Sequence, residues 1–177
     1  MPSGRTRTII QGEVLVSDDP ELLIATTVGS CVAACLYDPR RGVGGMNHFL
    51  LPDSPLGPDG QEARALRYGV NLMELLINGL LSRGATRSSL RAKVFGGARI
   101  NLGLTDAGPR NADFVERFLR HEGIPLVGGS LRGAEGRRVQ FWPVTGRARQ
   151  MMCGPAAPLE TRPILGQQAG LGDVELF

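Results

Sequence analysis

The sequence predicts a single α/β domain of the mixed α+β kind, in which short strands pack with two main helices. The chain has 177 residues and a hydrophobic content of 42%, which is enough for one buried core. Short runs rich in β-branched residues alternate with turn-forming residues along most of the chain. Two longer segments instead carry apolar residues at helical spacing. We therefore expect one domain built from both kinds of element.

The strands are predicted from β-prone runs bounded by turn residues. Ser17-Asp18-Asp19-Pro20 separates the first two runs, Pro39-Arg40-Arg41-Gly42 the next two, and Thr145-Gly146 the last two. Pro39 suits the second position of a type I turn because its φ angle is fixed near the required value. The expected strands are residues 14–16, 22–27, 31–38, 43–52, 91–95, 124–127, 138–144 and 147–152.

Two helices are predicted, at residues 61–83 and 110–122. In both segments the apolar residues recur at the spacing that places them on one helix face. Gly84 and Gly123 follow the two segments, at the position where helix ends favour glycine. Residues 53–60 are rich in Pro and Gly and are expected to form a loop before the first helix.

The domain itself is expected to span residues 8–152. Residues 1–7 are then an N-terminal extension, and residues 153–177 form a flexible C-terminal tail, since Pro and Gly are frequent and core residues are few there. The last six residues, 172–177, combine acidic and hydrophobic side chains. They either dock on a partner as a short linear motif or form a frayed terminus.

Composition and cysteine pattern exclude several classes of protein. The first residues lack the apolar run of a signal peptide, and no segment offers the roughly 18 apolar residues of a membrane span. Cys31, Cys35 and Cys153 match neither an even disulfide framework nor paired zinc ligands. We therefore expect a cytoplasmic protein with no membrane insertion and no metal.

Basic residues form two clusters, although the net charge of +3 is mild. The clusters lack the interleaved aromatic residues of a nucleic-acid stacking surface, so no nucleic-acid partner is expected. They either attract an acidic partner surface or form a solvated face. The first cluster is Arg83, Arg87, Arg91, Lys93 and Arg99, and the second is Arg132, Arg137, Arg138, Arg147 and Arg149.

Cys31 and His48 are the candidate catalytic pair. If two residues, Pro39-Arg40, form the reversal between their strands, antiparallel pairing sets Cys31 directly opposite His48. Opposed residues have Cβ atoms about 5 Å apart, which lets a thiol and an imidazole share a hydrogen bond. One bulged residue would turn either side chain to the other face of the sheet.

A cysteine beside a histidine is suited to nucleophilic attack on an amide. His48 would remove the proton of Cys31, because the thiolate is the reactive form, and would then protonate the leaving amine. Backbone N–H groups at Gly29-Ser30 are candidate donors to the oxyanion that forms. Cys35 and Cys153 are interpreted as core residues, since an isolated cysteine is usually buried.

The segments that carry the pair, GSCVAACLYDP and GGMNHFLLP, resemble the signature of the CheD family of chemoreceptor glutamine deamidases. The resemblance continues through KVFGGARI, RNADFVERFLRHEGIPLV and GRRVQFWPVTGR, and covers about residues 8–152. It implies a layered α/β domain related to the cysteine hydrolase fold of cytotoxic necrotizing factor toxins, with a Cys–His–Thr site.

The resemblance carries Cys31 and His48 into that site directly but leaves the threonine open. Family members usually have it six residues before the cysteine, where this chain has Ala25. A one-residue deletion would make Thr26 the equivalent, whereas strand alternation gives Thr27 the same facing as position 25. Either threonine is otherwise an ordinary strand residue.

The activity implied by the resemblance is hydrolytic deamidation of selected glutamine side chains on methyl-accepting chemotaxis receptors, which sets adaptation in chemotaxis. Such a protein-glutamine glutaminase needs no cofactor, since thiolate, imidazole and water suffice. In some members a CheC-like phosphatase is a partner. Asn47, next to the base, either orients the imidazole, binds the substrate amide, or makes a turn or sheet hydrogen bond. The alternatives are a catalytically weak docking module of the same fold, and transglutamination or peptide cleavage by the same pair.

Overall fold

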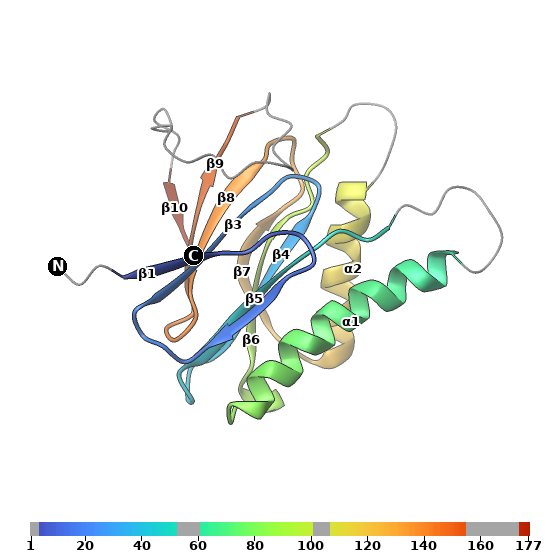
Figure 1. Cartoon of the computed structure of the whole chain (residues 1–177). Coiled ribbons are helices and arrows are strands. Elements are labelled where there is room, and N and C mark those ends of the chain that lie inside the picture. Colours follow the sequence, from blue (N-terminus) through green and yellow to red (C-terminus); the bar gives the residue numbers. More distant parts are fainter. Residues whose placement is uncertain (1–3, 53–60, 101–106, 155–173) are drawn as a thin grey trace.

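Two β-sheets and two helices form three layers in the computed structural model (Figure 1). The helices α1 (Gln61–Ser82) and α2 (Ala107–Glu122) lie on the face of the second sheet that points away from the first sheet. The predicted α/β class with two main helices is therefore confirmed. The described residues are 4–52, 61–100, 107–154 and 174–177.

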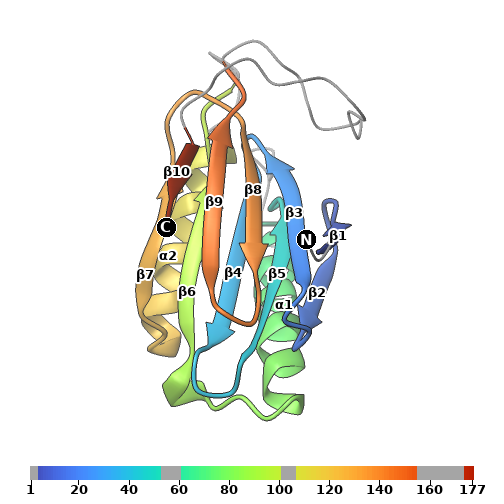
Figure 2. The same cartoon turned by 90° about the vertical axis from the view of Figure 1, so that its left-hand side faces the viewer.

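Within the described part of the chain, each sheet has five strands. The first has the order β1-β3-β8-β9-β10, and the second has the order β2-β5-β4-β6-β7. Figure 2 shows the molecule from the side of the first sheet, with β8 and β9 in front and the helices behind. The strands are β1 (Arg5–Thr8), β2 (Val14–Ser17), β3 (Leu22–Val28), β4 (Val32–Asp38), β5 (Val43–Phe49), β6 (Arg91–Gly96), β7 (Leu126–Leu131), β8 (Arg137–Trp142), β9 (Arg147–Met152) and β10 (Val174–Leu176).

Apolar cores lie on both faces of the second sheet. Along β4, Val32 and Leu36 face the helices, whereas Ala33 and Cys35 face the first sheet. This strand is apolar on both sides because it is the central strand of the middle layer, with a core on each face. The core between the two sheets, called the inter-sheet core below, contains Ile9, Leu22, Ile24, Val28, Cys31, Ala33, Cys35, Met46, Phe95, Val139, Phe141 and Ala148.

The turn between β4 and β5 is longer than the sequence predicts. Asp38 pairs with Val43, so four residues rather than two form the reversal. The carboxylate of Asp38 accepts hydrogen bonds from the backbone N–H groups of Arg40 at 2.9 Å and Arg41 at 3.1 Å. Gly42 completes the turn with a φ of 71°, a left-handed conformation that favours glycine. The side chain of Asp38 thus stabilises a wider turn than Pro39 alone suggests.

This wider turn changes the strand register. His48 pairs with Ala33 and not with Cys31, so the predicted opposition of Cys31 and His48 is wrong. Cys31 lies just before β4 begins, in a bend where ladder pairing does not apply. The relation between the two side chains therefore depends on the bend and on the layers, as described below.

Strands at both ends of the chain lie outside the predicted limits of the domain. β1 pairs in parallel with β3 although all four of its residues are exposed. β10 pairs with β9, and Phe177 packs edge to face on Phe95 with ring centroids 5.5 Å apart. The expectations of an extension at 1–7 and a flexible tail at 153–177 are thus wrong for these strands. Short edge strands are held largely by backbone pairing, which leaves little hydrophobic pattern in the sequence.

The other elements agree with the predictions except at their ends. α2 begins at Ala107 rather than at residue 110. β7 covers Leu126–Leu131 rather than 124–127, because Gly128 and Gly129 interrupt the apolar run that marked it. The predicted loop at 53–60 and most of the predicted tail, 155–173, lie outside the described residues.

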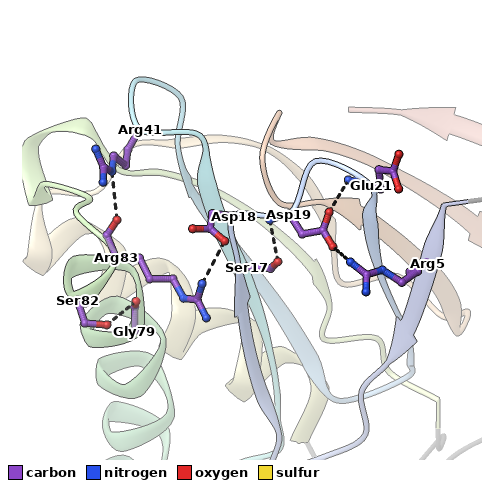
Figure 3. A network of polar contacts seen from close by, with 9 residues as sticks. All are labelled: Arg5, Ser17, Asp18, Asp19, Glu21, Arg41, Gly79, Ser82 and Arg83. Atoms are coloured by element: carbon purple, nitrogen blue, oxygen red, sulfur yellow. Dashed lines mark hydrogen bonds and ion pairs between the residues drawn. The ribbon is translucent and has the colours of Figure 1, made fainter. Parts of the chain in front are cut away.

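Polar contacts join the elements at the end of the molecule where β3 begins (Figure 3). Arg83, just beyond α1, donates to the carboxylate of Asp18 at 3.2 Å. The Arg83 carbonyl oxygen accepts a hydrogen bond from Nε of Arg41 at 3.2 Å. An ion pair between Arg5 and Asp19 joins β1 to the turn before β3. The opposite end, where β3 leads into β4, carries the candidate site.

Candidate active site

The candidate site lies where the chain crosses from the first sheet to the second. Residues 29–31 form a bend between the end of β3 and the start of β4. The carbonyl oxygen of Cys31 accepts a hydrogen bond from the N–H of Gly97 at 2.8 Å. A Cβ atom at Gly96, whose φ is 109°, would come within 2.1 Å of that oxygen, so only glycine fits there. The segment that ends β6 therefore fixes the backbone of Cys31.

Asn111 of α2 joins the two segments that carry the site, and its side chain is fully buried. Its Nδ2 donates to the carbonyl oxygen of Ser30 at 2.9 Å, and its Oδ1 accepts the N–H of Leu51 at 3.0 Å. Ser30 immediately precedes Cys31. Leu51 follows three residues after His48. One amide group therefore holds both halves of the site together. Asn111 lies in the segment RNADFVERFLRHEGIPLV noted above, but the sequence had suggested no role for it.

Cys31 is 2% exposed and belongs to the inter-sheet core. Its Sγ lies 3.9 Å from Oε1 of Gln11, at the range of a weak S–H···O hydrogen bond. The next residue, Gly12, donates its N–H to the carbonyl oxygen of His48 at 2.7 Å. Cys31 and His48 therefore both border the turn at residues 10–13, which the sequence analysis had not singled out.

His48 of β5 and Thr26 of β3 meet across the space between the two sheets. Thr26 Oγ1 lies 2.8 Å from His48 Nδ1 and 2.8 Å from the carbonyl oxygen of Ile9. Both side chains are buried. A hydroxyl has one proton and the carbonyl only accepts, so Thr26 donates to Ile9 and accepts from Nδ1–H of His48. The imidazole proton is then on Nδ1, and Nε2 is the basic nitrogen.

The buried environment of His48 also sets its charge. Burial lowers the pKa of His48 from 6.5 to about 4, and the negative charge of Glu13 opposes this shift. The imidazole is therefore neutral near pH 7, which is the form that accepts a proton. Burial therefore disfavours the imidazolium form of His48 at this site.

The neighbours of Thr26 on β3 point elsewhere. Side chains alternate along the strand, so Thr26 faces the second sheet with Ile24 and Val28, whereas Ala25 and Thr27 face away. A threonine at position 25 would share the outward facing of Thr27. Of the two threonines that the sequence left open, the structure brings only Thr26 to the imidazole.

Asn47 lies on the opposite face of β5 from His48. Its Nδ2 donates to the carbonyl oxygen of Leu72 on α1 at 3.1 Å, and its Oδ1 accepts the N–H of Ala34 at 3.2 Å. The side chain is fully buried among these partners. The structure therefore does not bring Asn47 to the site, and its hydrogen bonds join β5 to β4 and to α1.

The other two cysteines are interpreted from the sequence as core residues, and only one of them is fully buried. Cys35 is fully buried, and burial raises the pKa of its thiol well above the usual value. Cys153 is half-buried, and burial raises its pKa as well. None of the three cysteines, all of which are in the described part of the chain, forms a disulfide.

Within residues 4–52, 61–100, 107–154 and 174–177, no three His, Cys, Asp or Glu side chains are grouped so that they could hold a metal ion. In the same part of the chain, no helix has both the length and the apolar character needed to span a membrane.

Comparison with known proteins identifies the family. The family model described as CheD chemotactic sensory transduction matches residues 50–151. A probable chemoreceptor glutamine deamidase CheD of Acidiphilium cryptum is 55% identical over 98% of this chain and 94% of its own length. The chain belongs to the CheD family. A CheD relative from Caulobacter sp. strain K31, with the same description, is 54% identical over 96% of this chain and 91% of its own.

A third CheD relative, from Rhizobium rhizogenes, is 52% identical over 99% of this chain and 97% of its own length. These alignments extend over the segments that carry Cys31 and His48, which precede the part matched by the CheD family model. Among solved structures, hypothetical protein YfiH of Bacillus licheniformis has a TM-score of 0.44 and 18% identity over 73% of this chain and 60% of that chain. This distant similarity adds nothing to the assignment.

Proposed function

We propose that this chain deamidates glutamine side chains of methyl-accepting chemotaxis receptors in the cytoplasm, with Cys31 as the nucleophile and His48 as the base. The observation that carries the proposal is the hydrogen bond between Thr26 and His48, which leaves Nε2 of a neutral imidazole as the proton acceptor. Relatives described as probable chemoreceptor glutamine deamidases support the choice of substrate.

The proposed reaction has two steps. His48 Nε2 takes the proton of Cys31 as Sγ attacks the amide carbon, and the same proton then goes to the leaving nitrogen, so that ammonia departs. Water, deprotonated by His48, next attacks the thioester, and the thiol and a glutamate carboxylate form. Backbone N–H groups of the Gly29-Ser30 segment are the proposed donors to the tetrahedral oxyanion.

Gln11 supports this chemistry from within the chain. Its amide oxygen lies 3.9 Å from Sγ of Cys31, so the surroundings of the thiol accommodate a side-chain amide. Gln11 is exposed, which lets it move aside for a substrate glutamine. No cofactor has a role in these steps, since thiol, imidazole and water complete the balance of atoms.

A catalytically weak module of the same fold that docks on receptors or on a phosphatase is the second candidate function. The replacement of the usual threonine by Ala25 favoured it in the sequence. The contact of Thr26 with His48 removes that reason, because a threonine hydroxyl stands beside the imidazole. A CheC-like phosphatase partner remains a prediction from the family resemblance.

Mass spectrometry of a receptor fragment tests the proposal. The purified cytoplasmic fragment of a methyl-accepting chemoreceptor is incubated with wild-type protein, with Cys31→Ala, and with the matched control Cys35→Ala. Each glutamine converted to glutamate adds about one dalton, since NH₂ is replaced by OH. We expect the gain with wild type and with Cys35→Ala but not with Cys31→Ala. An equal gain with Cys31→Ala would exclude Cys31 as the nucleophile.

A further inference from the structure

A hollow of about 290 Å³ opens beside α2 and is lined by a mixture of apolar and cationic side chains. This volume is at the lower end for a ligand site and suits one or two side chains of a bound polypeptide. Leu51, Leu66 and Phe114 supply apolar surface. We call this hollow the arginine pocket, and its lining residues are Leu51, Leu66, Arg99, Pro109, Arg110, Asp113, Phe114 and Arg117.

The arginine pocket lies next to the candidate active site. Leu51 lies three residues beyond His48, which corresponds to about 10 Å of extended chain. Arg110 precedes Asn111, whose amide is hydrogen bonded to Ser30 beside the nucleophile. A substrate residue in the pocket would therefore lie close to the glutamine whose amide meets the thiol.

The charge of the pocket is positive. Among the described residues that line it, three are cationic, Arg99, Arg110 and Arg117, and one is acidic, Asp113. The carboxylate of Asp113 already forms an ion pair with Arg132 at 2.6 Å, so it does not neutralise Arg110 or Arg117. A negatively charged group is the ligand that this lining favours.

The guanidinium of Arg110 is partly anchored and partly without a partner. Its Nη1 donates to the carbonyl oxygen of Pro52 at 2.9 Å, which holds the side chain in place. Its Nη2 is buried and has no hydrogen-bond partner among the residues described here. A buried N–H of a charged group without a partner is costly, and a carboxylate oxygen is its strongest natural acceptor.

We propose that the arginine pocket binds an Asp or Glu side chain of the substrate protein, close to the glutamine that is deamidated. This inference rests on the proposed function and adds a determinant of substrate choice to it. The carboxylate meets Arg110, with Arg117 nearby, while the methylene groups pack on Phe114 and Leu51. On a helical substrate, 10 Å corresponds to about seven residues, so the acidic residue lies within that distance of the target glutamine.

Binding measurements separate this proposal from the activity itself. The probe is the cytoplasmic fragment of a methyl-accepting chemoreceptor, and Kd is measured by calorimetry with Cys31→Ala protein, in which the fragment stays intact. Into this background we introduce Arg110→Gln, which keeps a polar side chain but removes the charge. Arg117→Gln is the second variant. Arg120→Gln is the matched control, since Arg120 is exposed on the same helix and does not line the pocket.

We expect Arg110→Gln to weaken binding about tenfold, the usual loss for a hydrogen bond to a charged group, and Arg117→Gln to weaken it less. Arg120→Gln is expected to bind like the parent. In the receptor fragment, each Asp and Glu within seven residues of the target glutamine is replaced by alanine. The replacement of the residue that occupies the pocket should weaken binding to the Cys31→Ala parent, but should cause no further loss of binding to the protein that also carries Arg110→Gln. Additive losses from the two partners would overturn the proposal.

Two further outcomes distinguish this proposal from the proposed function. If the wild-type protein deamidates no receptor while binding still depends on Arg110, the proposed function is wrong but the proposal that the pocket binds an acidic residue is retained. If deamidation proceeds with the same KM in wild type and Arg110→Gln, the proposed role of the pocket is wrong and the proposed function is retained. A fall in kcat at unchanged Kd would also overturn the pocket, because Arg110 would then act through Pro52 on the geometry of the site.

Discussion

Replacing Thr26 by valine is the most direct test of how His48 is held. Valine keeps the shape of the side chain but removes a hydroxyl that makes two buried hydrogen bonds of 2.8 Å. The carbonyl oxygen of Ile9 and Nδ1–H of His48 would both lose a partner. Each unsatisfied buried group costs about 1–3 kcal/mol, so the loss of two partners should lower the free energy of unfolding by about 2–6 kcal/mol.

The effect on activity follows from the same bond. A neutral hydrogen bond contributes about 1 kcal/mol, and its loss also lets the imidazole rotate and change tautomer. We therefore expect kcat for receptor deamidation to fall about tenfold or more at 25 °C, where tenfold corresponds to about 1.4 kcal/mol. Thr26→Ser, which keeps the hydroxyl, should restore most of the rate.

Thr27→Val is the matched control, because this neighbouring threonine faces the other side of β3. Rates are measured by ammonia release from a receptor fragment at a temperature where unfolding curves show each variant fully folded. If Thr26→Val and Thr27→Val reduce kcat equally, the hydroxyl of Thr26 does not orient the imidazole. The same conclusion follows if Thr26→Ser is as slow as Thr26→Val.

Three other predictions follow from the buried contacts. Because the pKa of His48 is about 4 when folded and 6.5 when unfolded, its contribution to stability is complete above pH 6.5 and is lost as the pH falls toward 4. The free energy of unfolding, measured with urea, should therefore fall by about 3 kcal/mol over this pH range. In His48→Gln the free energy of unfolding should depend less on pH. Asn111→Asp keeps an acceptor for the N–H of Leu51 but places a second oxygen against the carbonyl oxygen of Ser30, so kcat should fall more than in Asn111→Ala. Equal rates of the two variants would argue against a role of this side chain in holding Ser30 and Leu51 in place. Ala25→Thr should give no gain in activity, and a clear gain would contradict the outward facing of this position.

The sequence predicted the elements of this fold well because periodicity survives where side chains are buried. The strands on either side of the β4–β5 turn and both helices follow from apolar patterns. β1 and β10 were missed because their residues are exposed and backbone pairing leaves no such pattern. The register was missed because a carboxylate, Asp38, widens the turn through side-chain hydrogen bonds that residue types alone do not reveal.

The site was predictable in part for the same reasons. Cys31 and His48 lie in adjacent predicted segments, so the sequence brought them into one region even with the wrong register. The choice between Thr26 and Thr27 depended on which face of β3 packs against the second sheet. The packing of the two sheets decides this, and the sequence of β3 alone does not. Asn111 and Gln11 act through contacts between distant segments, and their residue types are common on surfaces and in turns. No local pattern distinguishes such residues.

Several of the clustered basic residues are engaged in contacts within the chain, so the clusters alone do not predict a surface for binding an acidic partner. Arg137 is 1% exposed and donates to the carbonyl oxygen and the hydroxyl of Ser130, so reversing its charge would damage the fold before it tested any partner. Arg132 forms ion pairs with Asp113 and Glu116. Much of the second cluster thus serves the structure of the chain.

The first cluster is similarly engaged, since Arg83 pairs with Asp18 and Arg87 with Glu122. Lys93 is buried and donates to the carbonyl oxygens of Gly146 and Phe177. A broad attraction between a basic face of this chain and any acidic partner would then be weak and strongly reduced by salt. A carboxylate held beside buried apolar surface is screened less, because water and ions reach it poorly. The proposed contact with the guanidinium of Arg110 would therefore select one glutamine among many more strongly than a broad basic face would.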